Sequence, residues 1–132
     1  MPAAYAYQAS HAERRGLFAR AMLDFFREMA ETHGSSDDLS DYLPNYAIVL
    51  AVQVGQGDGR EMTVTDIAHY INAPRATVWR AVRRMEKRGH VRVVPKGKRK
   101  IVLHQQLCES EVAVRKYEAT TKFVRSVAAL YP

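Results

Sequence analysis

The sequence predicts a mainly α-helical fold with one small β-hairpin, and three observations lead to it. Residues 10–33 contain no proline and carry a wide apolar face, and residues 45–54 (NYAIVLAVQV) are apolar nearly all round. Two short β-branched runs, residues 91–94 and 100–103, flank a turn that contains glycine, as in a hairpin. The chain has 132 residues, of which 47% are hydrophobic, so it suits one domain, residues 1–132, around a single core.

The first helix is predicted over residues 10–33. Ser10 and Glu13 have the spacing of a capping box, in which each side chain accepts a hydrogen bond from the other residue's backbone N–H. Gly34 is the expected stop, because glycine adopts the left-handed conformation that ends many helices. The apolar face of this helix recurs at helical spacing through Leu17, Ala21, Phe25 and Met29.

Three further helices are predicted before the hairpin and one after it. The second helix begins at residues 41–44, since proline is tolerated in a first turn, and it forms the buried centre of the core. The third helix is short and capped by Thr65, and a tight connection at residues 73–74 leads into a fourth, strongly basic helix over residues 75–88. The last helix covers residues 110–130.

Positive charge is concentrated in one part of the chain. Residues 75–100 contain eleven Lys and Arg and a single acid, Glu86, which gives this segment a net charge of +10. The rest of the chain carries −4, against a total of +6. Opposite charges normally stabilise a surface helix at i,i+4 spacing, so their scarcity indicates that an external polyanion supplies the negative charge. A solvated charge run is the alternative, but it would not need the apolar periodicity of this segment.

The short helix, tight turn, basic helix and basic hairpin together have the plan of a winged helix-turn-helix. The basic helix fits the major groove of DNA, and the short helix braces it through a shared apolar face. That face consists of Ile67, Ala68, Ile71, Val78, Val82 and Met85. The hairpin loop suits a phosphate backbone or a narrow minor groove. Double-stranded DNA is therefore the predicted partner, and its predicted contacts are Thr65, Arg75, Thr77, Trp79, Arg80, Arg83, Arg84, Lys87, Lys96, Lys98, Arg99 and Lys100.

Trp79 has two interpretations. It lies on the flank of the basic helix, about 90° from the direction that faces the core. Its ring could stack on a sugar or a thymine methyl group of DNA, or it could pack under a neighbouring loop such as the wing. Packing is the favoured interpretation.

Residues 63–94 (TVTDIAHYINAPRATVWRAVRRMEKRGHVRVV) resemble the winged-helix segment of the MarR family of bacterial transcriptional regulators. In that family, the terminal helices of two chains interlock into a dimer, and many members release DNA when a small aromatic ligand binds. The resemblance matches the start of the short helix to Thr65 and Asp66, and the reading positions to Thr77, Trp79, Arg80 and Arg84. The wing departs from the family pattern, because PKGKRKIVLH carries no acid.

A homodimer built from both ends of the chain is predicted. The helices over residues 10–33 and 110–131 carry more apolar residues than one chain of this size can cover, so a second copy is expected to bury them. Residues 42–104 then form the DNA-binding lobe, and the predicted function is that of a repressor on a palindromic operator. A small aromatic effector is a further expectation, with the candidate contacts Phe25, Phe26, Tyr42 and Tyr46.

Other functions lack the residues that they need. The five histidines do not lie at ligand spacing beside cysteines or clustered carboxylates, so no metal site is predicted. Without a GxSxG motif or a phosphate-cradling glycine loop, neither an enzyme nor a cofactor is expected. Cys108 is the single cysteine, which fits a reducing cytoplasm, and its acidic neighbour Glu109 disfavours a redox-sensing thiolate. No segment is long and apolar enough to predict a membrane span.

Two functions of other classes stay open. A nucleoprotein or replication module would use the same winged helix for architecture and would bind DNA without sequence preference. A protein–protein adaptor would use the basic face to bind an acidic partner and would have no affinity for DNA.

Overall fold

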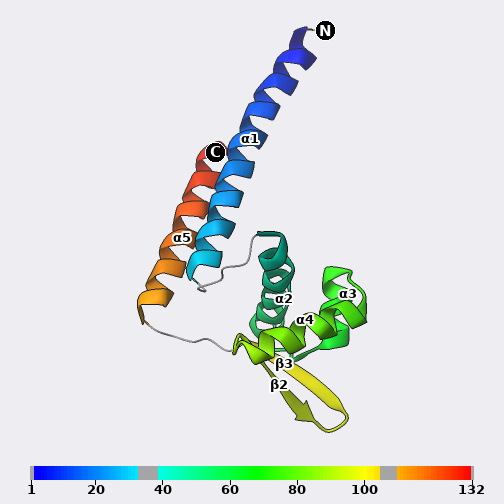
Figure 1. Cartoon of the computed structure of the whole chain (residues 1–132). Coiled ribbons are helices and arrows are strands. Elements are labelled where there is room, and N and C mark those ends of the chain that lie inside the picture. Colours follow the sequence, from blue (N-terminus) through cyan, green and yellow to red (C-terminus); the bar gives the residue numbers. More distant parts are fainter. Residues whose placement is uncertain (1, 33–38, 105–109, 132) are drawn as a thin grey trace. The chain divides into compact units, whose positions relative to one another are not determined.

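The structure, a computed structural model, describes residues 2–32, 39–104 and 110–131 (Figure 1). The described elements are α1 (Pro2–Thr32), α2 (Leu39–Gly57), β1 (Met62–Thr63), α3 (Val64–Ile71), α4 (Arg75–Lys87), β2 (Val91–Lys96), β3 (Arg99–His104) and α5 (Ser110–Leu130). They divide into two compact units: the helical pair, residues 1–39 with 108–132, and the winged lobe, residues 40–107. The predicted fold class, mainly helical with a small antiparallel sheet in a winged helix-turn-helix, is confirmed.

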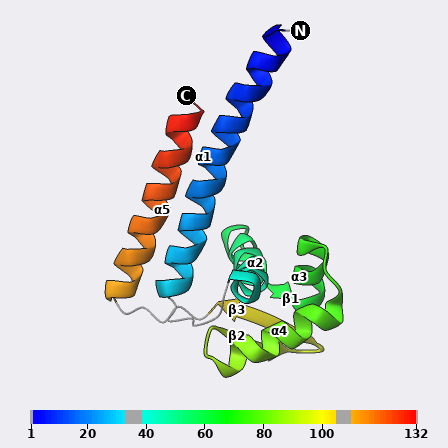
Figure 2. The same cartoon turned by 45° about the horizontal axis from the view of Figure 1, so that its top comes forward.

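In the helical pair, α1 and α5 lie side by side, although most of the chain separates them in sequence (Figures 1 and 2). Aromatic rings fill the space between them: Phe25 stacks on Phe123 with 5.0 Å between the ring centroids. Beside these rings, Lys122 Nζ lies 3.0 Å from Glu28 Oε1, and this hydrogen bond raises the pKa of the lysine. Small and apolar side chains, such as Ala119, are buried along the same contact.

The first helix begins earlier than the sequence predicted. The expected cap at Ser10 is wrong, because residues 2–9 are already helical and Ser10 lies inside α1. The alanine-rich start has high helix propensity, and Pro2 is tolerated in the first turn because its missing N–H would have no helical partner there. The expected stop at Gly34 falls outside the described residues.

The core of the winged lobe is formed by α2, α3, α4 and the sheet. The apolar face predicted for the two helices of the reading unit is confirmed: Ile67 and Val82 are both 0% exposed, and Ile71 packs against the cluster from its edge. The buried set comprises Ile48, Ala51, Val52, Met62, Val64, Ile67, Ala68, Val78, Ala81, Val82, Met85, Val91 and Val102.

The sheet has three antiparallel strands in the order β1-β3-β2. The hairpin strands β2 and β3 are each longer than predicted, and only Gly97, with φ 63°, and Lys98 form the turn between them. Val102 pairs with Met62 of β1 and with Val93 of β2. Met62 and Val102 are buried in the core cluster, and the partly buried Val93 packs against it. Strand β1 was not predicted, because two residues are too short to show an alternating pattern.

Gly55 marks the closest approach between α2 and the segment that leads into the sheet. A Cβ atom at this position would meet the Met62 side chain and would lie 2.8 Å from the carbonyl oxygen of Arg60. The backbone of Arg60 is held at this point by a 2.7 Å hydrogen bond from its N–H to the Gly55 oxygen. Only glycine therefore lets β1 pass this close to α2.

Candidate nucleic-acid interface

The start of α3 is fixed by a capping box. Thr63 Oγ1 accepts a 3.1 Å hydrogen bond from the Asp66 N–H, and Asp66 Oδ2 accepts a 2.9 Å hydrogen bond from the Thr63 N–H. The backbone hydrogen bond from Thr63 holds the pKa of Asp66 below its usual value. The predicted cap at Thr65 is wrong, because β1 delivers the chain to the helix two residues earlier. The Thr-x-x-Asp spacing was the signal that could have identified Thr63.

Thr65 connects α3 to α4 instead of capping α3. Its Oγ1 accepts a 3.0 Å hydrogen bond from Arg75 Nε, so the first residue of α4 is tied to the first turn of α3. Between the helices, Asn72 takes the left-handed conformation (φ 55°) and Pro74 occupies the N-cap position of α4. This tight connection, as predicted, sets the direction in which α4 leaves α3.

Helix α4 has the buried and exposed faces that its sequence predicts. Val78, Val82 and Met85 are buried, whereas the opposite face exposes Thr77, Arg80, Arg83, Arg84 and Lys87. Within the described part of the chain, no ion pair balances the charges of Arg80, Arg84 or Lys87. The core thus holds the helix in place and leaves these three cations without an ion-pair partner among the described residues.

A Schellman motif ends α4. The Gly89 N–H donates to the Glu86 oxygen over 3.0 Å, and the His90 N–H donates to the Met85 oxygen over 2.9 Å. Gly89 has φ 78°, a conformation that side chains other than glycine rarely adopt. The motif turns the chain directly into β2, so that the wing follows the basic helix without a loop of its own.

Trp79 links the basic helix to the wing. Its half-buried ring packs against the core, and two cations lie over it: Lys100 Nζ from β3 at 5.1 Å and the Arg83 guanidinium at 5.3 Å from the ring centroid. This geometry agrees with the packing interpretation of Trp79. Cation–π attraction holds each charge near the ring without neutralising it.

Glu86, the one acid of the basic segment, has a structural role that the sequence did not reveal. Its Oε2 accepts a 3.1 Å hydrogen bond from the Val93 N–H of β2, while Oε1 lies 3.5 Å from Arg83. The carboxylate therefore ties α4 to the wing and orients an arginine beside Trp79.

The wing places its cations on both sides of its turn. Lys96 Nζ lies 2.5 Å from Glu61 Oε1, and Arg99 lies 3.8 Å from Asp66 Oδ2, so two wing cations are tied to the body of the lobe. Lys98, at the turn, has no ion pair with any residue that the structure describes. Glu61 and Asp66 were not among the predicted site residues, because a distant acid gives no local signal of its partner.

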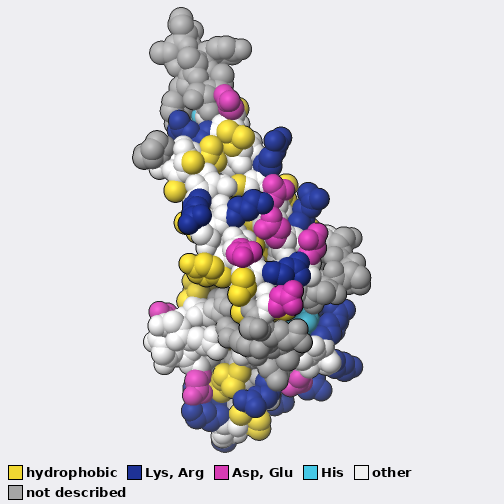
Figure 3. Space-filling view, turned by 90° about the vertical axis from the view of Figure 1, so that its left-hand side faces the viewer, with side chains coloured by type: hydrophobic (Ala, Val, Ile, Leu, Met, Phe, Trp, Pro, Cys, Tyr) yellow, Lys and Arg dark blue, Asp and Glu magenta, His cyan; other side chains and the backbone are white. Residues whose placement is uncertain are grey.

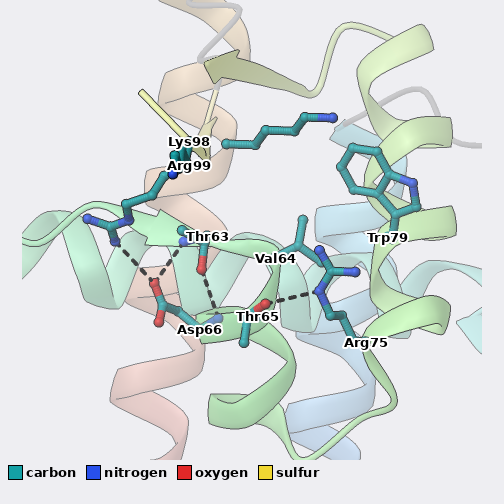
Figure 4. A pocket seen from close by; sticks show the side chains of 9 residues that line it. Thr63, Val64, Thr65, Asp66, Arg75, Trp79, Lys98 and Arg99 are labelled. Atoms are coloured by element: carbon teal, nitrogen blue, oxygen red, sulfur yellow. Dashed lines mark hydrogen bonds and ion pairs between the residues drawn. The ribbon is translucent and has the colours of Figure 1, made fainter. Parts of the chain in front are cut away.

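An open pocket of about 590 Å³ lies between the start of α3, the start of α4 and the wing (Figure 4). Figure 4 shows Arg99 directed at Asp66 and Arg75 directed at Thr65, with Trp79 on the side of Arg75. The structure thus brings together six of the predicted contacts. The pocket is lined by Thr63, Val64, Thr65, Asp66, Arg75, Trp79, Lys98, Arg99 and Lys100.

The four aromatic residues predicted to contact an effector are divided between the two units. Phe25 and Phe26 belong to α1, where their ring centroids are 5.9 Å apart, and Tyr42 and Tyr46 belong to α2, where their rings stack at 5.6 Å. Burial raises the pKa of both tyrosines. Cys108 lies outside the described residues.

Two further features are absent from the described residues. No helix in the described ranges is both long and apolar enough to span a membrane. The same ranges contain no group of three or more histidine, cysteine, aspartate or glutamate side chains that could hold a metal ion.

Comparison with known proteins finds a similarity to transcriptional regulators. Residues 59–121, just under half of the chain, match the family described as the sugar-specific transcriptional regulator TrmB. The predicted resemblance of residues 63–94 to the MarR family is not confirmed by this match. A crystal structure of a probable transcriptional regulator from Pseudomonas aeruginosa is similar at 17% sequence identity and a TM-score of 0.47, covering 86% of this chain and 81% of that chain. No curated protein matches the chain. Residues 59–121 are therefore similar to a transcriptional-regulator family in sequence and fold as a winged helix.

Proposed function

We propose that this chain is a homodimeric transcriptional regulator that reads a palindromic site in double-stranded DNA. The observation that carries the proposal is the pairing of a rigid core with an exposed cationic face on α4. Arg80 and Arg84 project from a helix whose opposite face is fixed by Val82 and Met85. Such a helix fits the major groove, where arginine recognises guanine through two hydrogen bonds.

The distribution of charge supports DNA as the partner. The helical pair carries acidic, basic and apolar side chains close together on the face seen in Figure 3. Residues 75–100 of the winged lobe, by contrast, hold eleven bases and one acid. A concentrated positive surface with a rigid reading helix is the pattern of sequence-specific DNA binding, whereas a solvated tail would have no such core.

The test separates base reading from backbone binding. Arg80→Ala or Arg84→Ala should weaken binding to the preferred site by about 1–3 kcal/mol and flatten the preference at one base pair. Lys98→Ala or Lys100→Ala should weaken binding to all sequences and lower the salt slope by about one unit each. Selection of bound genomic fragments, followed by sequencing, supplies the site. If only the wing variants alter sequence preference, the proposed roles are reversed.

The proposed homodimer rests on an exposed apolar stripe on α5. Tyr117 and Val124 lie seven residues apart, which places them on one face of the helix, and they are 72% and 56% exposed. Tyr131, another seven residues along and 48% exposed, directly follows the end of α5. A seven-residue apolar repeat is the pattern with which helices of two chains pack together. A two-fold dimer would present two α4 helices to successive major grooves, so the site should be an inverted repeat with half-site centres roughly 10 base pairs apart.

Repression is the proposed regulatory outcome, because a dimer that covers a promoter excludes other proteins from it. The architectural and adaptor functions make different predictions for the same binding experiment. Equal affinity for all duplexes would favour the nucleoprotein module, and no affinity for any duplex would favour the adaptor.

An effector that releases DNA is the remaining part of the proposal. The protonated hydroxyls of Tyr42 and Tyr46 can donate hydrogen bonds to a carboxylate, which favours phenolic carboxylates as the first class to screen. The matched family is described as sugar-specific, so sugars form the second class. An effector should raise the melting temperature and lower the affinity for DNA, and a panel that changes neither would exclude these two classes.

A further inference from the structure

The pocket beside the wing contains charges that the protein itself does not balance. Arg75 donates its Nε proton to the neutral Thr65 hydroxyl, and Lys100 lies over the neutral ring of Trp79. Lys98 lines the same pocket and forms no ion pair with a described residue. Each of these three cations is positioned, but none of them meets a carboxylate in the described part of the chain.

The one acid of the pocket is already engaged. Asp66 Oδ2 accepts the capping hydrogen bond from the Thr63 N–H and faces Arg99 at 3.8 Å. Asp66, like any ordinary aspartate, is negatively charged at neutral pH, and the capping bond lowers its pKa further. Asp66 and Arg99 therefore offset each other, and three positive charges remain around an open space of about 590 Å³.

We propose that this pocket binds one phosphate group. Arg75 can use the two terminal nitrogens of its guanidinium for phosphate oxygens, because only its Nε is engaged with Thr65. Thr65 Oγ1 accepts that bond and keeps its own proton to donate to the anion. Lys98 and Lys100 add charge from the wing side, so a bound phosphate would join the start of α4 to the hairpin.

The phosphate can come from two sources. One is the backbone of DNA, and for this source the inference rests on the proposed function. The other is a small phosphorylated molecule, which would occupy the pocket in the absence of DNA. Stacking of a nucleobase on Trp79 is not required in either case, because cations already lie over the ring.

Trp79 provides a direct measurement, since it is the only tryptophan of the chain and lines the pocket. Inorganic phosphate titrated into the full-length protein at constant ionic strength, balanced with chloride, should change the emission of Trp79 in a saturable way. Calorimetry under the same conditions gives a second readout. Arg75→Gln should raise the midpoint at least about tenfold, as expected for loss of a charged hydrogen-bonding group. Lys100→Gln should also raise it.

Arg92→Gln is the matched control, because Arg92 is an exposed cation of β2 that does not line the pocket. It should leave the midpoint unchanged. A saturable signal that Arg92→Gln weakens as much as Arg75→Gln would indicate general charge screening and would overturn the pocket as a site. Thermal melting of each variant verifies that it is folded.

The DNA arm distinguishes the sources. The preferred duplex is prepared with one neutral methylphosphonate at each backbone position in turn. If the DNA backbone is the source, a methylphosphonate at one position per half-site should lower the affinity of the wild type for the duplex. The same methylphosphonate should not lower the already weaker affinity of Arg75→Gln any further. Saturable phosphate binding without such a backbone position assigns the pocket to a small phosphorylated molecule. Phosphate binding by a protein that has no affinity for DNA overturns the proposed function and leaves the phosphate site standing. The absence of both a phosphate response and a coupled backbone position would overturn the inference.

Discussion

The winged lobe covers its large apolar side chains far better than the helical pair covers its own. Of the eight large apolar side chains that are exposed among the described residues, six belong to the helical pair, five of them on α1 or α5. In the winged lobe, thirteen buried residues form one continuous cluster, and the side chains left exposed on α4 are mostly basic. The two units therefore expose different chemistry to their surroundings.

The difference indicates how the two units divide the proposed function. A lobe with a complete core can hold a reading helix rigidly and present charge to a polyanion. A pair of helices that exposes Tyr117 and Val124 has apolar surface left to bury, and association with a second copy would bury it. The stability of the lobe should then be a property of one chain, whereas that of the helical pair should depend on protein concentration.

The largest expected effect tests the core of the lobe. Ile67 is 0% exposed, so Ile67→Ala should lower the free energy of unfolding by about 2–5 kcal/mol, because a cavity adds to the lost burial. Urea unfolding at several protein concentrations measures both the loss and its dependence on association. A loss below about 1 kcal/mol would mean that the lobe tolerates the cavity and is less tightly packed than its burial indicates.

The second prediction concerns the exposed stripe of α5. Val124→Lys should weaken self-association by about 2 kcal/mol or more, since it places a charge in the centre of the proposed interface. Ala129→Lys is the control, because Ala129 is also exposed on α5 but lies on a different face from the seven-residue repeat. Sedimentation at micromolar concentration provides the measurement. A wild-type chain that sediments as a monomer would contradict the dimer and the palindromic site together.

Much of the fold could be predicted because it depends on local patterns. The spacing of Val78, Val82 and Met85 predicted the buried face of α4, and Gly89 predicted its end. The start of α1 was missed because the alanine-rich residues before Ser10 are themselves helical. The other errors occurred where pairing between distant segments decides the outcome. Strand β1 exists because Met62 pairs with Val102, and that pairing moved the cap of α3 from Thr65 to Thr63.

The candidate site was predictable in its cations but not in their partners. Arg75, Lys98 and Lys100 stand out by charge density, whereas the bond from Arg75 to Thr65 depends on how α3 and α4 meet. Glu86 illustrates the limit, because its contact with the Val93 N–H requires the register of β2 against α4. Sequence therefore indicates which charges are available, and only the fold determines which of them remain unbalanced.

A pair of glycines gives a sharper comparison of the two units. Gly55→Ala should lower stability by about 1–3 kcal/mol, since the new Cβ would meet Met62 and the fixed carbonyl of Arg60. Gly16→Ala in α1 should raise helix stability by about 0.5–1 kcal/mol, because nothing lies within 4 Å of its Cβ position. Thermal melting of both variants measures the contrast. Equal effects of the two substitutions would mean that packing around Gly55 relaxes.

The smallest expected effect lies in the capping box of α3. Thr63→Ala should lower the free energy of unfolding by about 1 kcal/mol, as for loss of other helix caps.

Asp66 adds a dependence on pH to the stability of the start of α3. Its pKa is lowered in the folded state, so its stabilising contribution is present above the unfolded pKa of about 3.9 and is lost as the pH falls through the lower folded value. Asp66→Asn should remove this acid-sensitive part of the stability and leave Arg99 without its carboxylate partner. Urea unfolding of both proteins between neutral pH and roughly pH 3 tests the sign. A wild type and an Asp66→Asn variant whose stabilities fall in parallel over that range would show that the carboxylate does not stabilise the start of α3.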